Sequence, residues 1–165
     1  MIIGIGIDLV DIVRAARLVE GRDERQLGRL FTFREIDYAR RHADPARHFA
    51  ARLAAKEAAF KAMAGNELAR AVGWRDIEVV SLHDGRPTLE FHGHGRRRIE
   101  QLGCVQALIT LTHSDLSAAA VVLLIGPMPG AVASPPARIS GPAVALSDAP
   151  ETDDAPRRSR RGEED

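Results

Sequence analysis

The stretch that most constrains the fold runs from Arg47 to Ala64, RHFAARLAAKEAAFKAMA. Alanine fills eight of its eighteen positions, and neither glycine nor proline interrupts it. Alanine has the highest intrinsic helix propensity, and a run of this length spans enough turns for helix formation to be cooperative. We therefore expect the longest helix of the protein here, with the remaining elements packed around it.

Apolar and charged side chains share one side of this predicted helix. At about 100° per residue an apolar stripe about 80° wide contains Phe49, Leu53, Phe60 and Met63. Lys56 falls inside the stripe, Glu57 lies at its edge, and Lys61 follows one turn later. A half-buried carboxylate is costly unless a cation or hydrogen bonds compensate it, which favours a functional cluster. The pattern also allows an ordinary Glu57–Lys61 surface pair, with Lys56 extending to solvent.

The N-terminal segment IIGIGIDLVD predicts a strand that begins at the second residue. One face carries Gly4, Gly6 and Asp8, and the alternation places on the other face Ile3, Ile5, Ile7 and Leu9. Two glycines before a carboxylate leave room for a ligand to approach the backbone beside Asp8. Alternatively, the glycines allow a helix to pack closely, with Asp8 as a turn or capping residue. Leu9 stands where a dinucleotide fingerprint needs its third glycine, so that motif is excluded.

The other segments predict an α+β fold. Thr32 and Glu35 form a capping-box pattern that opens a helix, and Asp11 fits the N-cap of an earlier one. The Gly65-Asn66 pair predicts the end of the long helix. Further elements are expected in chain order as strands over 76–82 and 87–91 joined by an Asp-Gly turn, a helix over 96–102, and two apolar strands on either side of His113. By itself, a histidine at the position of His113 is more often structural or incidental than functional.

The composition changes after residue 126. Seven of the nine prolines and none of the aromatic residues lie in residues 127–165, so we expect a folded domain over 1–126 and a disordered tail over 127–165. The domain carries 18 basic and 16 acidic side chains, a near balance that argues against nucleic-acid binding. The single cysteine, Cys104, and the lack of a signal peptide or transmembrane run predict a cytoplasmic protein without membrane contact.

Arginines gather after the first strand. Arg14 and Arg17 point away from the apolar side of the predicted first helix, and Arg22 and Arg25 follow closely. Such a surface can attract an acidic protein partner. Taken alone, such a pattern is more often an ordinary solvated helix face, because acidic residues are interspersed.

Three segments together carry a family resemblance. They are GIGIDLVDIVR, FAARLAAKEAAFKA with the upstream FTFREIDYARR, and LTHSDLSAAAVV. In this order and spacing, over nearly all of residues 1–126, they resemble the holo-acyl-carrier-protein synthases, the small bacterial 4′-phosphopantetheinyl transferases. The resemblance implies a small antiparallel sheet packed with a long central helix, in a homotrimer with active sites between subunits. It also implies transfer of 4′-phosphopantetheine from coenzyme A to a serine of apo acyl carrier protein, releasing adenosine 3′,5′-bisphosphate.

The resemblance assigns roles to the residues singled out above. It implies that Asp8 and Glu57 bind Mg²⁺, a cation that prefers oxygen ligands. The catalytic residues would be Glu57, Lys61 and His113. Coenzyme A would be bound by Lys56, Lys61, Gly65 and His113. The acidic carrier protein would dock on Arg14, Arg17, Arg22 and Arg25.

Two departures from the family pattern leave other functions open. Ala64-Gly65-Asn66 replaces the usual G-T-G, and Ser117 replaces a tyrosine. A catalytically silent module that only binds the carrier protein is therefore an alternative, as is another metal-assisted phosphoryl or pyrophosphate chemistry on the same scaffold. Four residues are retained that docking a protein does not require, which argues against the silent module: Asp8, Glu57, Lys61 and His113.

Overall fold

The computed structural model describes residues 1–128. The predicted tail over residues 127–165 lies outside this part except for its first two residues, so the tail and its boundary remain predictions. The elements in chain order are β1 (Ile2–Asp11), α1 (Ile12–Val19), α2 (Glu24–Leu27), α3 (Phe33–Arg40), α4 (Pro45–Ala62), α5 (Glu67–Arg70), the 3₁₀ helix η1 (Trp74–Asp76), β2 (Ile77–Ser81), β3 (Pro87–Phe91), α6 (Gly93–Gln101), β4 (Gln106–His113) and β5 (Ser117–Ile125).

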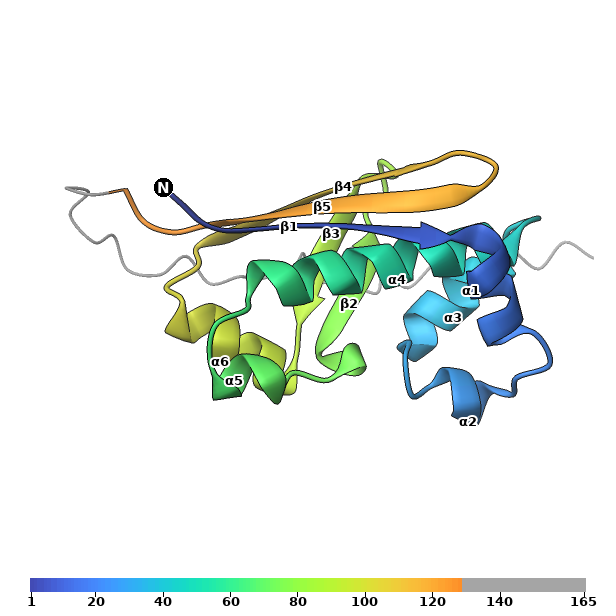
Figure 1. Cartoon of the computed structure of the whole chain (residues 1–165), viewed down its shortest axis with the longest axis horizontal. Coiled ribbons are helices and arrows are strands. Elements are labelled where there is room, and N and C mark those ends of the chain that lie inside the picture. The colour runs from blue at the N-terminus through green and yellow to red at the C-terminus, as the bar shows by residue number, and fades with distance from the viewer. Residues whose placement is uncertain (129–165) are drawn as a thin grey trace, which may run out of the picture. The chain divides into compact units, whose positions relative to one another are not determined.

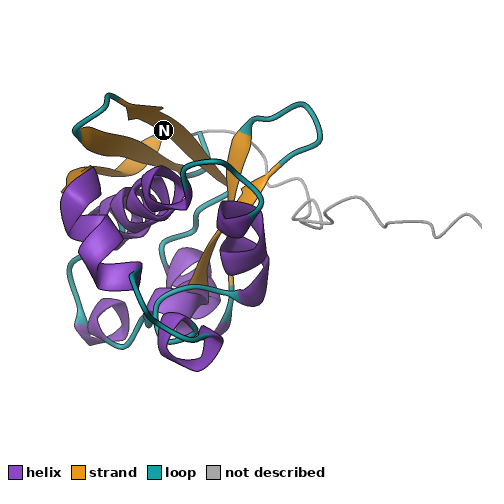
Figure 2. Ribbon diagram, turned by 90° about the vertical axis from the view of Figure 1, so that its right-hand side faces the viewer, coloured by secondary structure: helices purple, strands orange, loops and turns teal. Residues whose placement is uncertain are grey.

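The strands form two antiparallel sheets, which confirms the predicted α+β class. The larger sheet has the order β1-β5-β4, and β2 pairs with β3 in the smaller one. Figure 1 shows α4 running along one face of the larger sheet, and Figure 2 shows the other helices on the same side. Within residues 1–128, no helix is both long enough and apolar enough to cross a membrane.

The long helix matches the predicted stretch closely. It begins at Pro45 rather than Arg47, because Asp44 caps it by accepting a hydrogen bond from the Arg47 backbone N–H at 3.2 Å. It ends at Ala62, and Gly65 follows with a φ of 128°, which side chains rarely tolerate. The predicted stop at Gly65-Asn66 is therefore confirmed.

Two glycines allow β1 to lie directly on α4. A Cβ atom at Gly6 would lie 1.9 Å from the carbonyl oxygen of Ala58, and one at Gly4 would lie 2.3 Å from that of Ala62. Both distances are too short for any side chain, so these glycines are required for close helix packing. Asp8 is neither a turn nor a capping residue, because it lies inside β1.

The opposite face of the larger sheet is apolar and uncovered within the described residues. Ile5, Ile7 and Leu9 are 66%, 64% and 66% exposed, although isoleucine and leucine usually avoid water. Their cross-strand partners, which share this face, are Leu123, Val121 and Ala119 on β5. We call this surface the outer sheet face.

The structure corrects the expectation that Lys56 contacts coenzyme A. Its side chain is completely buried and lies 2.8 Å from Glu35, which is equally buried. The ammonium also donates to the carbonyl oxygens of Trp74 and Ile77, at 2.7 and 2.6 Å. Burial lowers the pKa of Lys56, while the Glu35 carboxylate opposes that shift. With its three donors used inside the core, Lys56 joins α4 to α3, η1 and β2 rather than facing a ligand.

Candidate active site

Asp8 and Lys61 meet where β1 passes α4. Lys61 Nζ lies 2.6 Å from Asp8 Oδ1 and 2.9 Å from the carbonyl oxygen of Ile7. The Asp8 side chain is 18% exposed and that of Lys61 is 53% exposed, so the pair lies at the surface edge of the packed interface. Lys61 therefore pairs with Asp8, and the surface pair with Glu57 that the sequence allowed does not form.

Glu57 lies on the same flank of α4, one turn before Lys61. The strand β1 runs antiparallel to α4, because Gly4 lies against Ala62 and Gly6 lies against Ala58. Asp8, two residues after Gly6, therefore lies beside the helical turn that precedes Ala58, and Glu57 belongs to this turn. Glu57 is half-buried, and within residues 1–128 its carboxylate makes no hydrogen bond or ion pair. Two carboxylates on adjacent elements, one of them without a partner, suit Mg²⁺, which binds few carboxylates and keeps several waters. The residues present therefore fit this ion.

A second acidic cluster lies on the β2–β3 hairpin. Glu78, Glu90 and His92 offer ligand atoms within 4.8 Å of one another. Glu78 already accepts hydrogen bonds from Thr32 and His92, at 2.8 and 2.9 Å. Arg34 lies 3.2 Å from Glu90 and 3.9 Å from Glu78, so a cation already balances this cluster. The contacts of the cluster are explained without a metal.

His113 does not join Asp8, Glu57 and Lys61 within one chain. It lies at the end of β4, two strands away from β1, and lines a groove of about 700 Å³ together with His48. His48 and Glu57 are nine residues apart, about two and a half turns, so they lie on opposite flanks of α4. Asp8, Glu57 and Lys61 line neither this groove nor the smaller adjoining one. Of the residues assigned to coenzyme A, Lys56 is buried in the core, and Lys61 and His113 lie on two separate surfaces.

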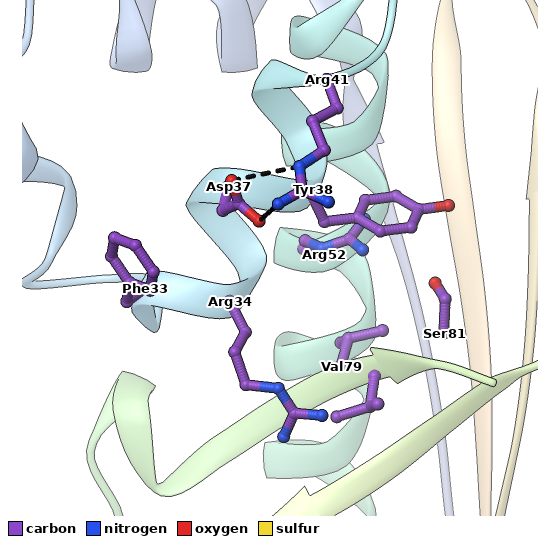
Figure 3. Close-up of a pocket in the computed structure, with 9 residues that line it drawn as sticks. Phe33, Arg34, Asp37, Tyr38, Arg41, Arg52, Val79 and Ser81 are labelled. Atoms are coloured by element: carbon purple, nitrogen blue, oxygen red, sulfur yellow. Dashed lines mark hydrogen bonds and ion pairs between the residues drawn. The ribbon is translucent and has the colours of Figure 1, made fainter. Parts of the chain in front are cut away.

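Arg52 is the main charged group of the His113 groove. It is only 3% exposed, its Nη1 donates to the carbonyl oxygen of His48 at 3.3 Å, and its Nε has no hydrogen-bond partner within residues 1–128. Its guanidinium lies 4.1 Å from the ring centre of Tyr38, an arrangement visible in Figure 3. Burial lowers the pKa of Arg52, and the nearby Glu35 opposes this. A buried guanidinium with an unused donor favours an anionic ligand.

A smaller hollow of about 210 Å³ adjoins this groove (Figure 3), and Tyr38 and Arg52 line both. Arg41 also lines the hollow, but an ion pair with Asp37 at 2.6 Å already balances it. Arg34 lines the hollow as well and is paired with Glu90 at 3.2 Å. Arg52 is therefore the arginine of this hollow that makes no ion pair within residues 1–128.

His48 lies next to Arg52 as a neutral group. Burial is the main cause that lowers the pKa of His48 to about 4, and the neighbouring His42 and Arg52 lower it further. The rings of His42 and His48 are 4.0 Å apart, so protonating both would place two cations in contact. A bound anion would oppose this shift.

Sequence reasoning missed Arg52 and His48 as site residues. Both lie in the alanine-rich stretch, four residues apart, and therefore on one flank of α4. Their shared flank was visible in the sequence, but the burial of Arg52 and the approach of β4 were not. Gly65 lies exposed in the loop between α4 and α5, beyond the turn that carries Lys61.

The four arginines assigned to partner binding are exposed. Arg14 and Arg17 lie on α1, Arg22 on the following loop and Arg25 on α2, and none makes an ion pair within residues 1–128. Val13, 53% exposed, adds an apolar side chain to this basic surface. The arrangement suits an acidic partner with apolar contacts of its own.

Comparisons with known proteins identify the class to which this fold and site belong. A family model for the 4′-phosphopantetheinyl transferase superfamily matches residues 4–121. A holo-[acyl-carrier-protein] synthase of Koribacter versatilis is 41% identical over 124 residues, which make up 75% of this chain and 98% of the relative. A holo-[acyl-carrier-protein] synthase of Geobacter sulfurreducens is 41% identical over 127 residues, 77% of this chain and 100% of the relative.

Solved structures agree with this classification. The acyl carrier protein synthase of Mycobacterium tuberculosis is 36% identical, with a TM-score of 0.57 over 77% of this chain and all of that one. A holo-(acyl-carrier-protein) synthase from Bacillus anthracis, in complex with CoA (3′,5′-ADP), is 28% identical, with a TM-score of 0.61 over 77% of this chain and 99% of that one. The chain therefore belongs to the 4′-phosphopantetheinyl transferase superfamily, and within it to the holo-acyl-carrier-protein synthases.

Proposed function

We propose that this protein transfers 4′-phosphopantetheine from coenzyme A to a serine of apo acyl carrier protein, giving the holo carrier and adenosine 3′,5′-bisphosphate. The observation that carries this proposal is the Asp8–Glu57–Lys61 arrangement, where β1 and α4 are held in direct contact by Gly4 and Gly6. It occurs in a chain that aligns over most of its length with synthases of this activity.

We propose that Asp8 and Glu57 hold Mg²⁺. When bound there, the ion would neutralise negative charge on the pyrophosphate of coenzyme A and on the departing phosphate. Lys61, held at Asp8 and more than half exposed, can reach a phosphate oxygen with its remaining donor.

The transfer is a substitution at phosphorus. The serine Oγ of the carrier protein forms a bond to the phosphorus that bears the pantetheine arm, and the bond from that phosphorus to the bridging pyrophosphate oxygen breaks. Adenosine 3′,5′-bisphosphate departs with the bridging oxygen. Glu57, whose carboxylate has no protein partner among the described residues, can accept the serine proton. The nucleophile belongs to the carrier protein, so this chain needs no nucleophile of its own.

We also propose that the active site forms between subunits of a homotrimer. The outer sheet face, with Ile5, Ile7 and Leu9 exposed, is the kind of apolar surface that subunits bury. The Asp8–Glu57–Lys61 surface and the His113–Arg52 groove lie on opposite flanks of α4, so one protomer cannot easily use both on one substrate. A neighbour's groove would supply His113 and Arg52 to the phosphates of coenzyme A.

The carrier protein is proposed to dock on the basic surface of Arg14, Arg17, Arg22 and Arg25. Four exposed guanidinium groups without ion pairs in residues 1–128 would attract an acidic protein and accelerate its encounter. Docking beside β1 would bring the target serine toward Asp8. A reducing cytoplasm, in which Cys104 stays a thiol, is the proposed location.

Intact-mass spectrometry of apo acyl carrier protein, incubated with the protein, coenzyme A and Mg²⁺, tests the function. We expect a mass gain of one phosphopantetheine group, abolished by a chelator. Glu57→Gln keeps the side-chain size but removes the charge, so this variant should remain folded and lose turnover. No gain with several carriers would contradict the function and favour the carrier-binding module. Normal turnover by Glu57→Gln would contradict the assignment of that residue.

A further inference from the structure

A buried arginine on α6 holds the end of α4. Arg98 is 6% exposed, and its Nε and Nη2 donate to the carbonyl oxygens of Met63 and Ala64, at 2.8 and 3.0 Å. These carbonyls follow the last turn of α4 and have no helical partner. A cation at this position also interacts favourably with the negative end of the helix dipole.

The same arginine is connected to the far end of the loop. Its Nη1 donates to Oε1 of Gln101 at 2.6 Å, and the same oxygen accepts a hydrogen bond from Nδ2 of Asn66 at 2.9 Å. Asn66 in turn accepts a hydrogen bond from the backbone N–H of Ala69, at 3.0 Å, and so caps α5. Arg98 and Gln101 are three residues apart on α6 and share one face. We call Arg98, Gln101 and Asn66 the loop clamp.

The clamp encloses the segment in which this chain departs from the family pattern. Ala64-Gly65-Asn66 replaces G-T-G in this segment. Ala64 accepts a hydrogen bond from Arg98 of the clamp, and Asn66 is itself a member of the clamp. Gly65, between them, has a φ of 128°, so its conformation is not that of an ordinary residue. Lys61 lies only three residues before Ala64, in the last turn of α4.

We propose that Arg98 is a positioning residue for coenzyme A, acting through the loop from Met63 to Asn66 and the last turn of α4. This inference rests on the proposed function, in which Lys61 contacts that substrate, and on the role in coenzyme A binding that the family resemblance implies for Gly65. Arg98 itself is too buried to touch a ligand. Its three hydrogen bonds go to neutral oxygens and none goes to a carboxylate, so the arrangement orders a loop rather than balancing a charge.

The test compares Arg98→Leu with Arg97→Leu. Both variants remove one arginine from α6, but Arg97 is exposed and bonds to no described residue. We expect Arg98→Leu to raise the KM for coenzyme A about tenfold, which corresponds to about 1.4 kcal/mol, with the KM for the carrier protein changed less than about twofold. Arg98→Lys keeps the charge but offers one nitrogen in place of the three that Arg98 uses, so it should recover part of the loss. Arg97→Leu should match the unchanged protein.

Hydrogen exchange gives a readout that does not depend on catalysis. In Arg98→Leu the amides of residues 63–66 should exchange faster, while those of β5 should not change. If Arg98→Leu fails to fold, Gln101→Leu removes the acceptor that Arg98 and Asn66 share and leaves the Arg98 hydrogen bonds to Met63 and Ala64 in place. This variant should raise the KM for coenzyme A by about threefold.

An unchanged KM for coenzyme A in Arg98→Leu and Gln101→Leu would overturn the proposal. An equal rise of the KM for coenzyme A and the KM for the carrier protein would overturn it as well. Failure of the proposed function is distinguishable, because then the unchanged protein would not modify any carrier. The loop clamp would still be tested by hydrogen exchange and by direct calorimetric titration of coenzyme A.

Discussion

Replacing Lys56 with methionine separates a structural from a ligand-binding role for this lysine. The change keeps most of the side-chain volume but leaves the Glu35 carboxylate buried, with the backbone N–H groups of Thr32 and Val79 as its remaining donors. The carbonyl oxygens of Trp74 and Ile77 also lose their donor. Removing one partner from a buried ion pair typically costs about 3–5 kcal/mol. We therefore expect Lys56→Met to lower the free energy of unfolding by about this amount.

The assay is urea denaturation at fixed protein concentration, followed by the fluorescence of Trp74, the only tryptophan. The double variant Lys56→Met/Glu35→Gln removes the buried charge and keeps an acceptor for Val79, so it should recover at least half of the lost stability. Lys61→Met is the matched control: its ammonium is half exposed, so it should cost about 1 kcal/mol or less while turnover falls.

A Lys56→Met variant that loses less than about 1 kcal/mol of stability while its KM for coenzyme A rises would contradict the structural role of Lys56. That result would return Lys56 to the ligand-binding role expected from sequence. Equal stability of the single and double variants would also contradict the argument, because the unpaired carboxylate would then carry no penalty.

Further predictions concern the β1–α4 contact, the subunit interface, the basic surface and the groove. Gly6→Ala should lower the free energy of unfolding by about 2 kcal/mol and reduce turnover, because the added Cβ would force β1 away from Ala58. Differential scanning calorimetry would measure the stability and the mass assay the turnover. Normal values of both would contradict this prediction. Ile7→Lys should shift sedimentation from trimer to monomer, and an unchanged sedimentation coefficient would place the interface elsewhere. Arg14→Glu should raise the KM for the carrier protein and spare that for coenzyme A; the reverse would exchange the two assignments. The pKa of His48 falls from 6.5 to about 4 on folding, so between these values the unfolded chain binds a proton that the native chain does not. Stability should therefore decline as the pH falls from 6.5 to 4, and less steeply in His48→Gln; identical slopes in denaturation at several pH values would count against this.

Much of the secondary structure could be predicted because its signals are local. The helix propensity of alanine, the Asp44 and Thr32 caps and the Asp84-Gly85 turn act within a few residues, so the long helix, α3 and the β2–β3 hairpin lie where expected. Short elements such as α2, α5 and η1 were not predicted. Four-residue helices depend on packing for stability, and their sequence signal is correspondingly weak.

The candidate site was only partly predictable. The motifs singled out Asp8, Glu57 and Lys61, and the structure brings Asp8 and Lys61 into contact on the flank that carries Glu57. They also singled out His113, which lies across the sheet on a different surface. Which flank of a helix meets which strand depends on contacts between distant segments, and no local pattern encodes it.

The family, the α+β class, the order of the main elements and the acidic and basic residues available for chemistry can all be inferred from the sequence alone. The folded structure was needed to show that Lys56 is a core residue paired with Glu35, that Arg52 is buried with an unused donor, and that Arg98 holds the loop after α4. The physical reason is that a charged side chain takes its role from its surroundings. Burial and hydrogen-bond partners come from segments far away in the chain, and they become known only when the chain has folded.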